Sequence, residues 1–288
     1  MQCQIETAGL AEFLIEVEFV GTVTDSQRAT FQSAADRWSE VVSHVPCGGS
    51  RSNPAGRNLI TATLAEDDGP GGTLGSAVPI SVWNECPTIS AVAEITLDIE
   101  DVAQLEASGE LLDIILHEMG HAIGVGSFWS IPGLACSTCR RVRNAEWMCP
   151  ALVQEYNDLL GNPGGTEADI IEADFSSSKR RNEILRRTVC VHLDEDIFGV
   201  ELMTGIFHPS AGNPLSKLTA ASLEDIKYIV DPSAVDAYAL PLEKAGLRIE
   251  GQPRFTGSAV EATIDLLGQA GVVGQTTGYR IETFFIET

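Results

Sequence analysis

Lysine is scarce in this sequence. Only four of its 288 residues are Lys, and Lys and Arg together number 18 against 41 Asp and Glu, so the formal net charge at pH 7 is −23. A chain this acidic is repelled by phosphate backbones and by anionic lipid. We therefore expect no nucleic-acid partner and no binding to a membrane surface. An acidic, lysine-poor composition also fits a salty extracellular setting.

Long apolar runs and a basic N-terminal segment are absent as well. No stretch approaches the roughly 18 uninterrupted apolar residues of a membrane-spanning helix, so we expect no membrane span. Residues 1–21 contain four Glu and no Lys or Arg, whereas a signal peptide begins with positive charge. We therefore expect either an intracellular chain or one that begins after a removed leader.

Hydrophobic residues are plentiful and follow the periods of both strands and helices. They make up 44% of the chain, which excludes a disordered protein and supports one large domain or two small ones. Strands are expected at residues 13–20, 59–64 and 91–99, and helices at 24–42, 108–124 and 219–230. Ser108 is expected to cap the helix that ends at Gly124. The pattern indicates an α+β protein whose sheet packs on helices.

Residues 117–121 read His-Glu-Met-Gly-His, the HExxH pattern. At about 100° of rotation per residue, His117 and His121 project from one side of a helix, one turn apart, so that two imidazoles can reach one metal ion. Glu118 lies at the edge of that side, close enough to hold a water molecule without ligating the metal. The pattern favours a zinc site over two histidines that share a core helix by chance.

A catalytic zinc ion needs a third protein ligand and leaves its fourth position to water. In the short motif HExxHxxGxxH, the glycine turns the chain so that a third histidine follows three residues later. Gly124 stands at the glycine position, but Ser127 stands where the third histidine would be. A remote histidine must replace it, and the candidates are His44, His192 and His208.

The residues after His192 carry a family resemblance. Residues 201–205 read Glu-Leu-Met-Thr-Gly, so that HExxHxxG, a long inserted segment, a histidine and an ELM sequence follow one another in this order. Over residues 13–241 the chain resembles the leishmanolysin-like family of metzincin zinc endopeptidases. The resemblance implies that His117, His121 and His192 bind the zinc ion.

The resemblance also implies a mechanism. Zinc and Glu118 would activate water at a peptide bond, with Glu118 taking a proton and passing it to the leaving amine. Met203 would form a Met-turn beneath the metal. We expect protein or peptide substrates, a monomer, and an extracellular or cell-surface location. The alternative is a catalytically inactive relative that serves as a binding or adhesion module, but that role needs no general base such as Glu118.

The implied fold is an α+β, metzincin-like zinc peptidase domain with two lobes. A twisted mixed sheet and the active-site helix lie above a cleft, and the lower half is mostly helical with a long insertion. Residues 91–99 would be the strand at the cleft edge, to which an extended peptide can add. The expected parts are an N-terminal lobe at 1–124, a cysteine-containing insertion at 125–191, a lower lobe with the third histidine and the Met-turn at 192–245, and a strand-rich tail at 246–288.

Seven cysteines are more than most cytosolic chains of this length contain. A secreted family favours disulfides, with Cys3 left over. The expected pairs are Cys47 with Cys86 and two pairs among Cys136, Cys139, Cys149 and Cys190. The alternative is that the last four cysteines bind a structural zinc ion in an intracellular protein whose HExxH pattern is incidental.

Overall fold

The computed structural model describes residues 10–46, 56–83, 86–130, 136, 147–168, 170–171, 190–241 and 279–283. Among these residues no helix is long and apolar enough to cross a membrane. Most of the expected insertion at 125–191 and of the expected tail at 246–288 lies outside the described residues. The boundaries expected for the four parts of the chain stay predictions.

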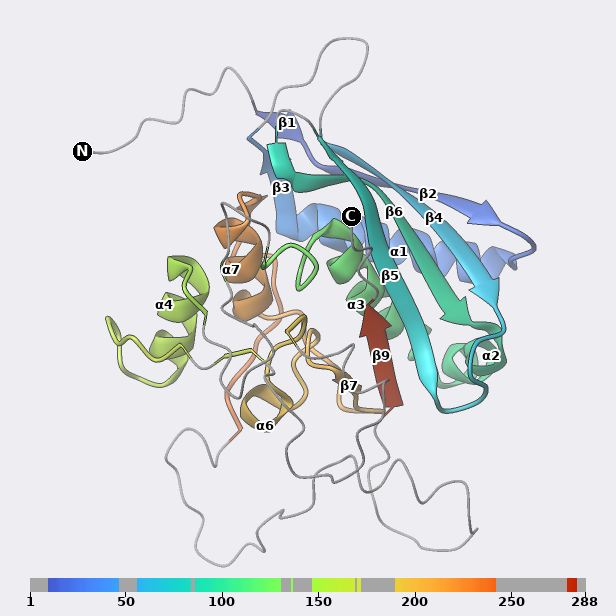
Figure 1. Cartoon of the computed structure of the whole chain (residues 1–288). Coiled ribbons are helices and arrows are strands. Elements are labelled where there is room, and N and C mark those ends of the chain that lie inside the picture. Colours follow the sequence, from blue (N-terminus) through green and yellow to red (C-terminus); the bar gives the residue numbers. More distant parts are fainter. Residues whose placement is uncertain are drawn as a thin grey trace, which may run out of the picture.

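A six-stranded mixed sheet is the centre of the fold (Figure 1). Its strands are, in spatial order, β2 (Leu14–Val20), β4 (Arg57–Ala65), β6 (Cys86–Asp98), β5 (Thr73–Trp83), β9 (Tyr279–Thr283) and β7 (Ile206–Phe207). The first three are parallel to one another, and β5 runs antiparallel to β6. β9 is parallel to β5 and antiparallel to β7. A second, small sheet has the order β1 (Ala11–Glu12), β3 (Val42–Val45) and β8 (Ile229–Val230).

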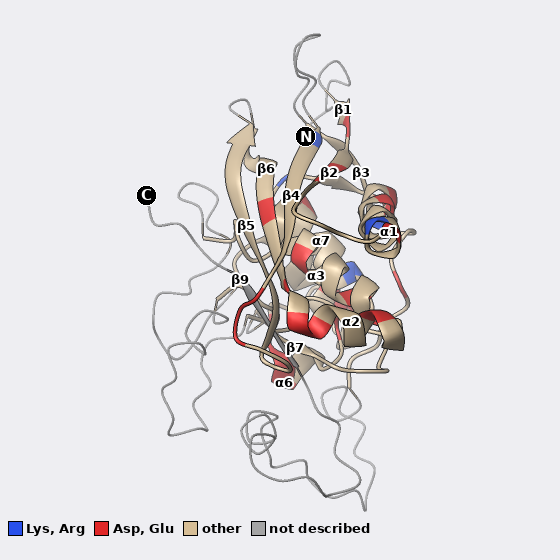
Figure 2. Cartoon of the chain, turned by 90° about the vertical axis from the view of Figure 1, so that its right-hand side faces the viewer, with Lys and Arg blue, Asp and Glu red and all other residues tan. Residues whose placement is uncertain are grey.

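Three helices lie on one side of the large sheet, namely α1 (Asp25–Val41), α2 (Ile99–Ser108) and α3 (Leu111–Ile123) (Figure 2). α1 begins at a capping box, in which the Thr24 hydroxyl accepts from the Gln27 amide and the Gln27 side chain accepts from the Thr24 amide. The buried Trp38 indole donates to the Leu116 carbonyl at 3.0 Å. This bond joins α1 to the helix that carries the HExxH pattern.

The rest of the described chain contains α4 (Pro150–Leu159), the short α6 (Glu195–Phe198) and α7 (Lys217–Asp225). Asp225 accepts hydrogen bonds from the Trp147 indole at 3.1 Å and from the amides of Ala151 and Leu152, both at 3.0 Å. A carboxylate at a helix N-terminus satisfies amides that have no partner within the helix. The end of α7 is thereby joined to the start of α4.

A disulfide between Cys136 and Cys149 precedes α4. It confirms that the expected insertion carries a disulfide, and it rules out a zinc site built from all four of the cysteines there. Cys86 and Cys190 are disulfide-bonded as well. Cys3, Cys47 and Cys139 lie outside the described residues, so the other expected pairings stay predictions.

Three expectations about the elements were wrong. Residues 91–98 belong to β6, which lies between β4 and β5 and so is not at the sheet edge, and Ile99 already begins α2. Ser108 ends α2, and α3 starts after Glu110, which makes no capping bond with its side chain. The helix expected to run to residue 230 ends at Asp225, because Lys227 takes a positive φ of 83° that an α-helix does not allow.

Candidate metal centre

Helix α3 presents His117 and His121 inside the protein, where both are fully buried. The helix ends at Gly124, as expected. Its φ is 121°, and a Cβ at this position would lie 2.6 Å from a ring carbon of Phe128. Only glycine fits such a turn without strain. After the turn the chain folds back, and the Val125 carbonyl comes within 2.8 Å of His121 Nδ1.

Three histidines converge at one point. Nε2 of His121 lies 2.9 Å from Nε2 of His117 and 3.0 Å from Nε2 of His192, and the remaining pair is 3.3 Å apart. All three side chains are completely buried. Among the described residues this is the one group of His, Cys, Asp and Glu side chains arranged so that it could hold a metal ion.

Two of the three rings have their tautomer fixed by the backbone. His117 Nδ1 lies 2.6 Å from the Leu202 carbonyl, and His121 Nδ1 lies 2.8 Å from the Val125 carbonyl. Because a carbonyl oxygen can only accept, both Nδ1 atoms carry the proton. The Nε2 atoms of these two rings therefore direct lone pairs at one another in a buried space, an arrangement that a cation between them would stabilise.

The electrostatics agree with this protonation state. Burial lowers the pKa of His117 and of His121 well below the ordinary value for histidine, and the neighbouring imidazoles lower both further. Neutral imidazole is the form that binds metal ions. Three nitrogens at about 2.0–2.1 Å from a tetrahedral ion would be separated by roughly 3.3–3.4 Å. The observed separations of 2.9, 3.0 and 3.3 Å are at or below this spacing, and the three imidazoles form a group that could hold a metal ion.

His192 reaches this group through pairing with the loop that contains Met203. The Leu193 amide donates to the Met203 carbonyl at 3.0 Å, and Leu193 also bridges to Thr204 and Ile171. These bonds hold the segment around His192 next to α3.

The other candidates for a third ligand lie elsewhere. His44 is part of β3 and pairs with β1 and β8 in the small sheet. His208 makes a hydrogen bond with Glu195 through its Nε2 atom. Ser127, at the position of the third histidine in the short motif, donates its hydroxyl to the His121 carbonyl at 3.0 Å. Neither His44 nor His208 belongs to the group of three histidines.

Met203 is completely buried and packs against α3. A Cβ placed on Gly120 of that helix would lie 2.7 Å from Met203 Sδ. Met203 therefore lies beside the turn of α3 that separates the two histidines. Its expected position beneath a metal ion is compatible with this contact.

Glu201 is a residue whose role the sequence analysis missed. Its buried carboxylate accepts from the Met203 amide at 2.6 Å, from the Ser216 and Thr219 hydroxyls at 2.6 Å each, and from the Ser216 amide at 3.3 Å. Burial raises its pKa, and these donors oppose the rise. The bonds fix the loop whose Leu202 carbonyl accepts from His117. A glutamate inside an apolar stretch, with Ser and Thr downstream, was the signal for this role.

Glu118, the expected general base, is completely buried. It lies under strand β5, since a Cβ placed on Gly75 would be 3.2 Å from Glu118 Oε1 and 3.1 Å from its Cγ. A Cβ at position 75 would press against this side chain and would come within 2.8 Å of Leu97 Cδ2. The role of Glu118 as a base stays a prediction.

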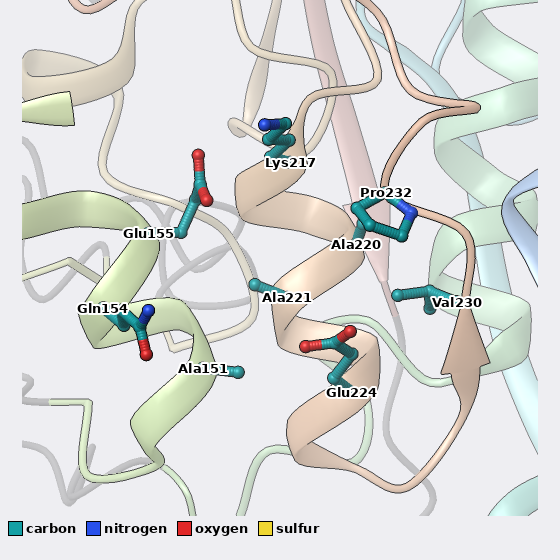
Figure 3. A pocket seen from close by; sticks show the side chains of 9 residues that line it. All are labelled: Ala151, Gln154, Glu155, Lys217, Ala220, Ala221, Glu224, Val230 and Pro232. Atoms are coloured by element: carbon teal, nitrogen blue, oxygen red, sulfur yellow. The ribbon is translucent and has the colours of Figure 1, made fainter. Parts of the chain in front are cut away.

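A separate hollow of about 180 Å³ lies between α4 and α7 (Figure 3). Ala151, Ala220 and Ala221 line it together with Glu155, Lys217 and Glu224. Burial raises the pKa of both glutamates, Lys217 lowers that of Glu155, and the charge of Glu155 adds to the rise at Glu224. None of the three converging histidines lines this hollow, so it is not part of the candidate metal centre.

Comparison with protein-family models and with curated proteins finds no match for this chain. The features that the structure does show are the buried group of His117, His121 and His192, the α3 helix that carries two of them, and the adjacent mixed sheet. These features are compatible with a zinc site.

Proposed function

We propose that this protein is a zinc-dependent endopeptidase. The convergence of three buried histidine Nε2 atoms, two of which come from an HExxH helix, carries the proposal. Three neutral imidazoles form a donor set that is typical of catalytic zinc, which keeps its fourth position open. The fully buried glutamate that follows the first histidine supports a catalytic role over metal storage.

The residues of the site have distinct tasks in this proposal. His117, His121 and His192 would hold the ion, and zinc, when bound, would supply a Lewis acid that acts on a water molecule and on the peptide carbonyl. Glu118 accepts a proton from water and returns it to the leaving amine. Leu202 and Val125 orient two of the imidazoles through their carbonyls, and Glu201 holds the loop that presents Leu202.

The finer features of the family also belong to this proposal. We propose a two-lobed, metzincin-like domain with Met203 beneath the metal, acting on protein or peptide substrates as a monomer without nucleic-acid partners. An extracellular or cell-surface location is supported by the disulfide between Cys136 and Cys149, because such bonds persist in oxidising compartments.

The proposal is tested by casein hydrolysis with the purified chain. Wild-type protein should cleave casein, 1,10-phenanthroline should stop the cleavage, and added zinc should restore it. Glu118→Gln should keep its metal and lose about 10²-fold or more in kcat, because the amide keeps the shape of the side chain and lacks the base.

Glu94→Gln, which changes an exposed glutamate of β6, is the matched control and should behave like wild type. Cleavage by metal-free protein would contradict the proposal, as would Glu118→Gln with near wild-type activity. Bound metal without hydrolysis in any condition would point instead to an inactive binding module.

A further inference from the structure

The C-terminal strand β9 lies between two parts of the chain that flank the candidate metal centre. On one side it pairs in parallel with β5, with Thr73 opposite Arg280, Ser76 opposite Glu282 and Ala77 opposite Thr283. On its other side it pairs antiparallel with β7, where Ile206 is opposite Arg280. Figure 1 shows β9 between β5 and the part of the chain that carries β7.

Both neighbours of β9 belong to the surroundings of the three histidines. The part of β5 that runs beside β9 spans residues 73–77, with a register shift between Thr73 and Ser76, and it contains Gly75, which lies against Glu118. β7 follows Met203 closely along the chain, and both β5 and β9 contact α3. The segment 279–283 thus runs in an extended conformation along the strand that covers the expected catalytic carboxylate.

Without β9, the outer edge of β5 would present its amides and carbonyls to any other extended chain. An exposed strand edge of this kind binds peptides by strand addition, with affinity from main-chain hydrogen bonds. In this structure the occupant of that edge is a segment of the same chain. A tethered segment competes with a free peptide at a high effective concentration, even when its own pairing is short and weak.

We propose that β9 is a built-in competitor of the substrate, which occupies the β5 edge beside the metal centre and must leave before a protein substrate can bind. This inference rests on the proposed peptidase function. The partner that fits the β5 edge is an extended peptide, and residues 279–283 occupy the position that this peptide would take. Release of this segment raises activity, and fixing it in place removes activity.

The register between β5 and β9 allows β9 to be fixed in place by an engineered disulfide. Ser76→Cys combined with Glu282→Cys places two cysteines at paired positions of β5 and β9. Oxidation should form a disulfide between them, seen by peptide mass mapping, and casein hydrolysis should fall at least 10-fold while the zinc content is unchanged. Reduction should restore hydrolysis. Ser76→Cys alone, in the same oxidant and reductant, controls for effects on the native disulfides.

A second variant acts in the opposite direction. Ile281→Pro removes a main-chain donor from β9 and should raise kcat/KM for casein about 10-fold, because proline weakens strand pairing. Binding is measured separately in a Glu118→Gln background, by the fluorescence anisotropy of a labelled casein peptide. The Ile281→Pro variant should bind the peptide more tightly than the protein with an unmodified β9 does. The disulfide-locked variant should bind it more weakly.

The outcomes separate this inference from the proposed function. Hydrolysis by the fully locked protein at the wild-type rate, or failure of the two cysteines to pair, overturns the inference while the peptidase function stands. Absence of hydrolysis in every variant contradicts the peptidase function. In that case the anisotropy measurement still decides, since equal peptide binding by locked and released variants overturns the inference.

Discussion

At the scale of single residues, the candidate centre depends on groups that never touch the metal position. The Leu202 and Val125 carbonyls select the tautomers of His117 and His121, so that lone pairs and not protons face the common point. Glu201 in turn holds the backbone around Leu202. Partners of this kind usually change metal affinity by 10- to 100-fold when they are lost.

Glu201→Gln tests this role. Glutamine has one acceptor oxygen, whereas donors approach both carboxylate oxygens of Glu201, so one donor must meet an NH₂ group. We expect zinc to transfer to a chromogenic chelator about 10-fold faster than from wild type. Thr219→Val, which removes one donor and keeps the carboxylate, is the control and should have a smaller effect. Equal release rates for Glu201→Gln and wild type would contradict the positioning role.

At the scale of elements, the end of α3 decides where the chain goes after the second histidine. Gly124 and Gly109 both end helices with a positive φ, but a Cβ at Gly109 would meet nothing within 4 Å, whereas one at Gly124 would strike Phe128. Substitutions at the two positions therefore distinguish the free energy lost to an unfavourable φ from the free energy lost to a steric clash.

Gly124→Ala should lower the free energy of unfolding by about 3 kcal/mol and Gly109→Ala by about 1 kcal/mol, since only the first adds a collision to the unfavourable φ. Urea denaturation of both variants measures the difference. A similar loss in both would show that Phe128 moves aside at little cost and that the turn is less constrained than the structure indicates.

A second link between elements depends on pH. His208, which follows β7, bonds to Glu195 of α6, and this bond raises the pKa of His208. Burial also raises the pKa of Glu195. His208 binds a proton more tightly in the folded state, so its contribution to stability is complete below the ordinary histidine pKa and is lost as the pH rises through the raised value. The contribution of Glu195 is complete only below the ordinary glutamate pKa and is lost as the pH rises through its own raised value.

His208→Gln should therefore cost about 1 kcal/mol more at pH 6 than at pH 8. Unfolding of wild type and variant by urea at the two pH values measures this difference, and the comparison cancels the pH response of groups that do not interact with His208. If His208→Gln lowers the free energy of unfolding equally at both pH values, protonation of His208 does not contribute to stability as proposed. The variant should keep its metal, because His208 does not belong to the group of three histidines.

At the scale of the whole molecule, the sequence predicted the α+β class, the mixed sheet and the two helices with the clearest periodicity. It also placed His117 and His121 on one helix, since the i, i+4 spacing is local. His192 came from a resemblance, because no local rule shows which distant histidine folds back to α3. Glu201 was missed, since its task depends on Ser216 and Thr219, which only the tertiary fold brings to it.

The order of the strands in the sheet could not be predicted from the sequence, for a similar reason. The residues of β5 include Gly75, Ser76 and Pro79, which obscure the alternation that marks a strand. The family resemblance implies that residues 91–99 lie at the cleft edge, whereas β5 and β9 lie beyond β6 in the structure. The position of β9 next to β5 could not be predicted either. A five-residue strand far along the chain has no sequence pattern that shows which strand it pairs with.

The central claim is that His117, His121 and His192 together hold one zinc ion, and the metal content of purified protein tests it most directly. Inductively coupled plasma mass spectrometry of the wild type should give about one zinc per chain. His192→Ala should lose most of that zinc, and His208→Ala, the matched control, should keep it. A wild-type protein without zinc, or a His192→Ala variant that retains a full equivalent while remaining folded, would contradict the claim.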